Sequence, residues 1–314
     1  MEFKICKYYG GADSAFTFTF DDGCYRQSSE ETIEIFKKIY EETGVKIKAT
    51  SAQTVNFLND DLVKFWQGAV NEGWYDIAAH SVGHDICYNK ETDYDKRKCD
   101  SEKSFYELKK YYPNEPIIAF VTPGGGSDSE GREVLKEQYV ANRNGNDRIN
   151  MPENIDWYDI GTFTATLNKA TSDYINNIDK TIKEKGWGVQ VNHWLTHKDE
   201  DIFHSQKYET FVEECRYISQ RAQRGEVWIA SLNEAIKYLK RAEKSVLEVT
   251  EIKDGYKVRI KDEKEGEKFD TPLTISAKTD KPITAIVDGE ERVLEPKDGV
   301  VYIDVKNEAT IKRS

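Results

Sequence analysis

Four acidic and histidine side chains in this sequence have the types and spacing of a metal site with a base beside it. Asp21 and Asp22 follow directly after Phe20, and His80 and His84 come about sixty residues later. Two imidazole nitrogens and one carboxylate oxygen suit Zn²⁺ and leave coordination positions open for water and substrate. The other carboxylate of the pair is then available as a base that takes a proton from that water.

The expected elements around these residues place them at strand ends. Residues 15–20 alternate phenylalanine with threonine, which is the period of a strand, so Asp21 and Asp22 come where that strand ends. Residues 74–79 read as another strand, and the spacing of His80 and His84 predicts a helical turn with both imidazoles on one side. Acidic doublets are also common in solvated turns, but the chain has only 5 histidines and two of them fall in this pentad.

These motifs resemble those of the polysaccharide deacetylase family, which is carbohydrate esterase family 4 or the NodB-homology family. Its first motif, TFDDG, matches residues 19–23 letter for letter, and its second, H-[ST]-x-x-H, matches residues 80–84. The resemblance implies that Asp21 is the general base and that Ser81 steadies the histidine loop. It also implies a divalent metal, usually zinc, with Co²⁺, Ni²⁺ or Mn²⁺ as alternatives. The implied metal ligands are Asp22, His80 and His84.

The third family motif, R-x-P-x-G, is present only in part. Val121 stands where the family has an arginine that pairs with the base. Arg143, at the end of the next expected strand, could take its place. The resemblance assigns Pro123 and Gly124 to the oxyanion and substrate-binding part of the site, with the backbone N–H of Gly124 donating to the oxyanion.

The last two family motifs suggest a groove wall and a general acid. Trp157 belongs to residues 154–157, which match the D-x-x-D-W motif only weakly, and it would form a wall of the substrate groove. Residues 187–193 fit a late strand that ends in a histidine, so His193 would protonate the leaving amine or alcohol. His197 is the alternative, and we favour His193 because it lies at the strand end. Two further aromatic residues that could line the groove or pack in the core are Tyr25 and Trp194.

Strand-like and helix-like segments alternate from residue 16 to about residue 240, which predicts a parallel sheet or barrel. Capping signals start helices at Ser28 and Ser231, Gly44 ends the first helix, and residues 144–158 are expected to be a long loop. We therefore expect an α/β fold, a distorted (β/α)7 barrel of the polysaccharide deacetylase type, with its chemistry at the C-terminal ends of the strands. The expected strands end near Phe20, Thr50, His80, Val121, Asn142, His193 and Ala230.

The character of the chain changes after residue 243. Short alternating runs between glycines and charged turns predict a small all-β, sandwich-like domain, and Asp288-Gly289 between two such runs is a hairpin signal. The expected division is a catalytic domain over residues 1–243 and an accessory domain over residues 244–314. The accessory domain has no tryptophan, so we expect a structural or docking role rather than sugar stacking.

Composition limits the partners of this chain. With 314 residues, a formal net charge of -12 and a mean hydropathy of -0.73, it is not expected to bind nucleic acid or to insert into a membrane. Five cysteines without metal spacing predict free thiols, with a Cys87–Cys99 bridge as the alternative. The start of the sequence has no signal peptide pattern, whereas the resemblance implies an extracellular or cell-envelope protein, so location and oligomeric state stay open.

The activity implied by the resemblance is removal of acetyl groups from an N-acetylated glycan of the chitooligosaccharide or peptidoglycan type. An O-acetyl esterase of the acetylxylan kind is the alternative chemistry on the same site. A glycan-binding pseudo-enzyme is the alternative from another class, and Val121 and the weak fourth motif motivate it. The intact Asp21, Asp22, His80 and His84 favour the enzyme.

Overall fold

The computed structural model describes residues 1–91, 93–198, 205–263, 269–287 and 289–312. These residues divide into two units. Residues 14–233 form one unit, and residues 1–13 together with 234–314 form the other. The division into a catalytic domain over residues 1–243 and an accessory domain over residues 244–314 stays a prediction.

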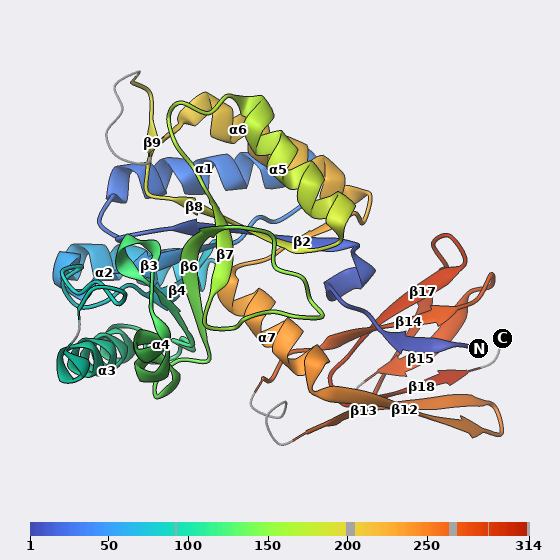
Figure 1. Ribbon diagram of the computed structural model, residues 1–314. Helices are drawn as coiled ribbons and strands as arrows, with labels where there is room; N and C mark the ends of the chain where they lie inside the picture. Colours follow the sequence, from blue (N-terminus) through green and yellow to red (C-terminus); the bar gives the residue numbers. More distant parts are fainter. Residues whose placement is uncertain (92, 199–204, 264–268, 288, 313–314) are drawn as a thin grey trace. The chain divides into compact units, whose positions relative to one another are not determined.

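Within the described residues of the larger unit, seven parallel strands form a closed ring (Figure 1), because β2 pairs with β3 on one side and with β8 on the other. An additional short strand, β11 (Val227–Ile229), pairs with the first half of β2. The expected (β/α)7 barrel is therefore confirmed. Its strands are β2 (Ser14–Phe20), β3 (Ala49–Gln53), β4 (Tyr75–Ala79), β5 (Ala119–Val121), β6 (Ala141–Asp147), β7 (Ile160–Thr164) and β8 (Trp187–Asn192).

The ring differs from the sequence expectation at β6 and β7. The loop expected from Asn144 is wrong at its start, because β6 continues to Asp147. The composition Asn-Gly-Asn-Asp is typical of turns, but here side-chain hydrogen bonds hold it in a bulged strand. β7 was not predicted, and it takes the place in the ring that the sequence assigned to β11.

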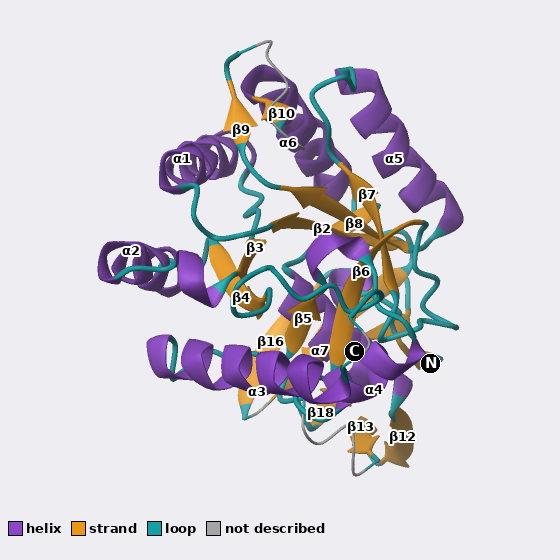
Figure 2. Cartoon of the chain, turned by 60° about the vertical axis from the view of Figure 1, so that its left-hand side comes forward, coloured by secondary structure: helices purple, strands orange, loops and turns teal. Residues whose placement is uncertain are grey.

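Helices α1 to α6 lie around the outside of the strands (Figure 2). α1 begins at Arg26, so the expected cap at Ser28 is wrong. Ser28 is buried inside the helix, where its hydroxyl accepts a hydrogen bond of 2.6 Å from the N–H of Leu195. The end at Gly44, in the left-handed conformation, is confirmed. The helices are α1 (Arg26–Thr43), α2 (Asp60–Asn71), α3 (Tyr94–Tyr111), α4 (Ser129–Lys136), α5 (Thr171–Glu184), α6 (Tyr208–Gln223) and α7 (Leu232–Glu243).

The alternation in β2 decides which way Asp21 points. All residues of β2 are buried, and rings on one of its faces, Phe18 and Phe20, pack edge-on against Phe211 of α6. Since successive side chains of a strand point to opposite faces, Thr19 and Asp21 lie on the face that looks into the barrel. The outward-facing side chains of β2 pack in the hydrophobic core against α6. The inward-facing side chains are followed by Asp21, the candidate base.

The smaller unit contains two antiparallel sheets within its described residues, ordered β1-β14-β17 and β12-β13-β18-β15-β16. The expected all-β part is confirmed, and β1 joins it by pairing with β14. The expected hairpin forms between β15 and β16, although Asp288 lies outside the described residues. The strands are β1 (Phe3–Ile5), β12 (Ser245–Ile252), β13 (Gly255–Asp262), β14 (Leu273–Lys278), β15 (Ile283–Val287), β16 (Glu290–Leu294), β17 (Val300–Val305) and β18 (Glu308–Lys312).

Short elements complete the described chain. β9 (Leu195–Thr196) pairs with β10 (Gln206–Lys207) beyond the end of β8. All five cysteines lie in the described residues and are free, so the Cys87–Cys99 alternative is wrong. None of the described helices has the length and apolarity needed to cross a membrane. The 3-10 turns are η1 (Tyr9–Gly11), η2 (Val55–Phe57) and η3 (Pro123–Gly125).

Candidate active site

A cavity of about 270 Å³ opens at the C-terminal ends of the barrel strands. Six residues singled out from the sequence come together in it, although they are spread over more than 170 positions of the chain. They are Asp21, His80, His84, Gly124, Arg143 and His193. The remaining lining residues are Thr122, Gly125, Gly145, Thr164 and Val191.

The three expected metal ligands converge on one point. The Nε2 atoms of His80 and His84 lie 3.7 and 3.8 Å from the same Oδ1 of Asp22. Within the described part of the chain, Nε2 of His80 is buried and has no hydrogen-bond partner. Its Nδ1 lies 2.7 Å from the carbonyl oxygen of Val121, which orients the ring and leaves Nε2 as the ligand atom. A buried nitrogen facing a carboxylate and a second imidazole fits a divalent cation.

The electrostatics of His80 agree with this use. Burial lowers the pKa of His80 to about 4, against the opposing effects of Asp21 and Asp22. The imidazole is therefore neutral at pH 7, which is the form that binds a metal.

The loop between the two histidines is not the helical turn expected from their spacing. Ser81 and His84 both have left-handed backbones, with φ of 68° and 62°. Two hydrogen bonds stabilise this bent shape, because the N–H of His84 donates to Oγ of Ser81 and the N–H of Val82 donates to the carboxylate of Asp100 on α3, each at 2.9 Å. Ser81 thus makes the loop contact that the resemblance implied.

The candidate base Asp21 is held by an arginine. Nη2 of Arg143 lies 2.5 and 2.6 Å from the two carboxylate oxygens of Asp21, and both side chains are buried. Burial alone would raise the pKa of Asp21, but Arg143, together with His80 and His193, outweighs it, and the pKa is lowered. The carboxylate is therefore ionised, as a general base must be before it accepts a proton.

The structure separates the two candidates for the general acid. His193 follows β8 directly and lines the cavity. His197 lies outside it, exposed, with its ring stacked on Tyr208 at 4.6 Å and its Nε2 3.5 Å from Glu31. Position therefore favours His193, and the catalytic role of either histidine stays a prediction.

The partial third motif forms the tight turn η3 at the cavity wall. Gly124 and Gly125 both have left-handed backbones, with φ of 67° and 73°, and both line the cavity. Pro123 is buried and does not line the cavity. Trp157 is also not among the lining residues, and its carbonyl oxygen accepts a hydrogen bond of 2.7 Å from the N–H of Asn142. Its place as a groove wall stays a prediction.

An aromatic pair stands beside the site. The rings of Tyr25 and Trp194 are 4.5 Å apart, and the Trp194 ring meets that of His193 edge-on at 6.1 Å. Burial raises the pKa of Tyr25, and the nearby Asp22 carboxylate raises it further. Tyr25 and Trp194 also line a second cavity of about 400 Å³. The pair thus lies near Asp22, an expected metal ligand, and near His193, the candidate acid.

Five lining residues were not predicted as site residues from the sequence, and two of them, Gly125 and Val191, lie in the partial third motif and in the strand before His193. Thr122 lies inside the partial third motif, so attention to the whole motif would have found it. Thr164 ends the unpredicted strand β7. Gly145 lies in the bulge of β6, where a glycine between asparagines reads as a loop.

Comparisons with known proteins support the architecture. No family model and no curated protein matches the sequence. Among solved structures, one assigned as a polysaccharide deacetylase from Mycobacterium smegmatis matches with a TM-score of 0.54 at 11% identity, over 79% of this chain and 98% of that one. A family 4 carbohydrate esterase from Streptomyces lividans matches with a TM-score of 0.45 at 16% identity, over 69% and 91% of the chains. A carbohydrate esterase family 4 pseudoenzyme from Bacillus anthracis matches with 0.44 at 13% identity, over 71% and 65%.

The chain therefore has the fold of the polysaccharide deacetylases of carbohydrate esterase family 4. At these identities the likeness establishes the fold, and chemistry must be argued from the site.

Proposed function

We propose that this protein is a metal-dependent deacetylase that removes acetyl groups from an N-acetylated glycan of the chitooligosaccharide or peptidoglycan type. One observation carries the proposal. The Asp22, His80 and His84 ligand atoms all lie within 4.8 Å of one another, and His80 and His84 line the same cavity as an ionised Asp21 and His193. A ligand set, a base and an acid in one cavity are the parts that hydrolysis of an amide requires.

A divalent cation, with Zn²⁺ the first choice, would act as a Lewis acid and lower the pKa of the attacking water when held by Asp22, His80 and His84. Asp21 accepts the proton of that water, and its ion pair with Arg143 keeps it ionised and fixed in direction. The backbone N–H of Gly124 donates to the oxyanion of the tetrahedral intermediate. His193 then gives a proton to the leaving nitrogen, and acetate departs.

The surroundings of the site support this substrate class. The Tyr25 and Trp194 pair offers aromatic surface to a sugar ring next to the acetylated one. An amine is a poor leaving group without a proton, so a histidine in the cavity favours an N-acetyl substrate over an O-acetyl one. Acetyl ester hydrolysis on the same residues is the second candidate function.

The test combines metal analysis with acetate release from N-acetylated chitooligosaccharides, peptidoglycan fragments and acetylated xylan. We expect about one divalent metal per chain and acetate from the N-acetylated glycans. Asp21→Asn should keep the metal and lose roughly 10²–10⁴-fold in turnover. Acetate from xylan alone would make the protein an ester hydrolase. Bound metal without acetate from any substrate would indicate the glycan-binding pseudo-enzyme.

A further inference from the structure

Strand β6 bulges immediately after Arg143. In the parallel pairing of β6 with β7, Arg143 is opposite Ile160, and Asp147 is opposite Thr162. β6 therefore advances four residues where β7 advances two, and the extra length lies in residues 144–146. A bulge turns the side chains beside it away from the direction that a regular strand would give them. The direction of Arg143 thus depends on what holds this bulge.

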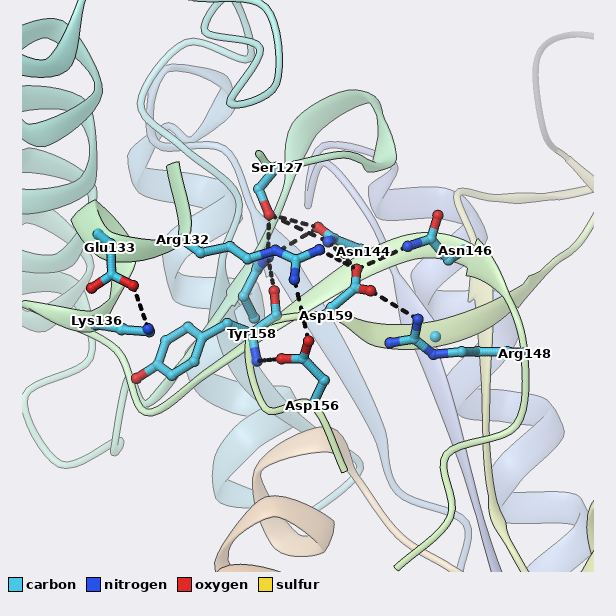
Figure 3. Close-up of polar contacts among 12 residues, drawn as sticks. Ser127, Arg132, Glu133, Lys136, Asn144, Asn146, Arg148, Asp156, Tyr158 and Asp159 are labelled. Carbon is cyan, nitrogen blue, oxygen red and sulfur yellow. Dashed lines mark hydrogen bonds and ion pairs between the residues drawn. The ribbon is translucent and has the colours of Figure 1, made fainter. Parts of the chain in front are cut away.

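One buried carboxylate holds the bulge. The side-chain amides of Asn144 and Asn146 both donate to Oδ1 of Asp159, at 2.5 and 2.8 Å (Figure 3). Nη1 of Arg148 donates to Oδ2 at 2.8 Å, and Nη2 of Arg132 lies 3.1 Å from Oδ1. Only 9% of the Asp159 side chain is exposed, so these groups replace nearly all of its water. Burial raises the pKa of Asp159, but the donors around it outweigh burial and lower it, which keeps the carboxylate charged.

The same contacts reach the turn that carries Gly124. Asn142 donates through Nδ2 to Oδ1 of Asn144 at 3.0 Å and accepts a hydrogen bond of 2.8 Å from the hydroxyl of Thr122. The N–H of Thr122 in turn donates to the carbonyl oxygen of Arg143 at 3.1 Å. A continuous set of hydrogen bonds therefore runs from Asp159 to Thr122, the residue directly before η3.

The bulge and η3 also touch directly. A Cβ atom on Gly125 would lie 3.2 Å from the Cα of Gly145, and one on Gly145 would lie 3.1 Å from the Cα of Gly125. The two glycines therefore pack backbone against backbone at the cavity wall, and neither side can shift without moving the other.

From these contacts we propose that Asp159 is a positioning residue. It anchors the bulge of β6, and through the bulge it directs Arg143 toward Asp21 and fixes the turn that presents the N–H of Gly124. The kinetic consequences rest on the proposed function, whereas the positioning itself does not.

Asp159→Asn is the most informative variant because it keeps the volume and removes the charge. One oxygen of Asp159 becomes an amide donor that faces other donors, so the bulge loses part of its anchor. We expect kcat to fall roughly tenfold with KM within about twofold, as for outer partners that orient a working side chain. Asn146→Ala, at an exposed position, should lower kcat in the same direction by a smaller factor and covers the case in which Asp159→Asn fails to fold.

A double-mutant cycle distinguishes positioning from a general loss of stability. If Asp159 acts through Arg143, Asp159→Asn should lower kcat in the wild-type background and have little further effect in an Arg143→Gln background. Equal factors in both backgrounds would overturn the proposal. Asp262→Asn is the matched control, because Asp262 also accepts from an arginine, Nη2 of Arg241 at 2.8 Å, but lies in the smaller unit. It should leave kcat unchanged.

A second readout does not need activity. With ¹⁵N-labelled arginine, the guanidinium of Arg143, assigned by its loss in Arg143→Lys, should give resolved Nη signals in the wild type because its rotation is restrained. Asp159→Asn should average these signals, and Asp262→Asn should not. Signals unchanged by Asp159→Asn would refute the positioning role. A wild type that releases no acetate would refute the proposed function alone.

Discussion

Arg143 on β6 lies directly opposite Val121 on β5 in the parallel register of the two strands. Val121 stands where the family motif has the arginine that pairs with the base, and the arginine of this chain comes from the next strand instead. Side chains that are opposite one another in a parallel pair share a face of the sheet, so both positions look toward Asp21. The chain can therefore lack an arginine at Val121 and still form an ion pair with Asp21, through Arg143.

This relationship predicts that the arginine can be moved between the two strands. Arg143→Val leaves the buried Asp21 without its cation and should lower kcat/KM by at least about tenfold, because an unpaired buried charge is strongly unfavourable. Val121→Arg added to Arg143→Val should recover a substantial part of the loss. The Val121 carbonyl that orients His80 is untouched by either change. Steady-state kinetics check this, and a double variant no better than Arg143→Val would show that the two positions are not equivalent.

The ligand assignment predicts the effect of removing a metal ligand. His80→Ala or Asp22→Ala should abolish metal binding and activity while the barrel stays folded, since both side chains lie just beyond strand ends and neither belongs to the hydrophobic core cluster. Metal content by elemental analysis and the unfolding transition by circular dichroism measure the two effects separately. His197→Ala is the control, because His197 is exposed and lies outside the cavity. Full metal retention in His80→Ala and Asp22→Ala would contradict the site.

The sequence predicts the parts of the site that depend on local pattern. Alternation in β2 and the strand before His80 place Asp21 and His80 at strand ends, and the barrel follows from the repeated order of strands and helices. The predicted helical turn from His80 to His84 is wrong. Ser81 and His84 have left-handed backbones, and the loop that contains them is held by a hydrogen bond to α3, which the spacing of the histidines does not reveal.

The contacts that hold β6 could not be predicted from the local sequence pattern. Asn144, Gly145 and Asn146 have the composition of a turn, and their place in a strand is decided by Asp159, which is distant along the chain. The ion pair of Arg143 with Asp21 spans 122 positions, so only the closed barrel brings the two together.

A buried glutamate should make stability depend on pH. Burial raises the pKa of Glu214 to about 7, although the side-chain amides of Gln206 and Gln190, at 2.6 and 3.1 Å, oppose it. The ordinary value is 4.5, so between these pH values the folded state binds more protons than the unfolded state. This contribution to the free energy of unfolding is complete below about pH 4.5 and is lost as the pH rises to about 7.

Glu214→Gln removes that titration while keeping the volume. Its free energy of unfolding should change less with pH between about 4.5 and 7, and at pH 8 it should exceed that of the wild type by up to roughly 3 kcal/mol. Urea unfolding at several pH values measures this. Asp179→Asn, which alters a half-exposed carboxylate on α5, is the control variant. Parallel curves for wild type and Glu214→Gln would mean that Glu214 does not titrate in this range.

The aromatic pair beside the site should select for chain length. Trp194→Ala removes half of the Tyr25 and Trp194 pair, so it should raise KM for an N-acetylated tetrasaccharide several-fold. Hydrolysis of a small aryl acetate, which does not reach the pair, should change little. Trp157→Ala gives the comparison, because Trp157 does not line the cavity. A chain-length effect in Trp157→Ala and none in Trp194→Ala would place the groove on the other side of the cavity.

The choice between His193 and His197 as general acid can be tested through the leaving group. A proton donor must reach the leaving atom directly or through one water, and His193 lines the cavity whereas His197 stacks on Tyr208 outside it. His193→Ala should therefore cost far more for an N-acetyl substrate, whose amine needs a proton to leave, than for an activated aryl acetate. His197→Ala should change both rates little and equally. A leaving-group-dependent loss in His197→Ala, with none in His193→Ala, would assign the acid to His197 and require the loop after β8 to move during turnover.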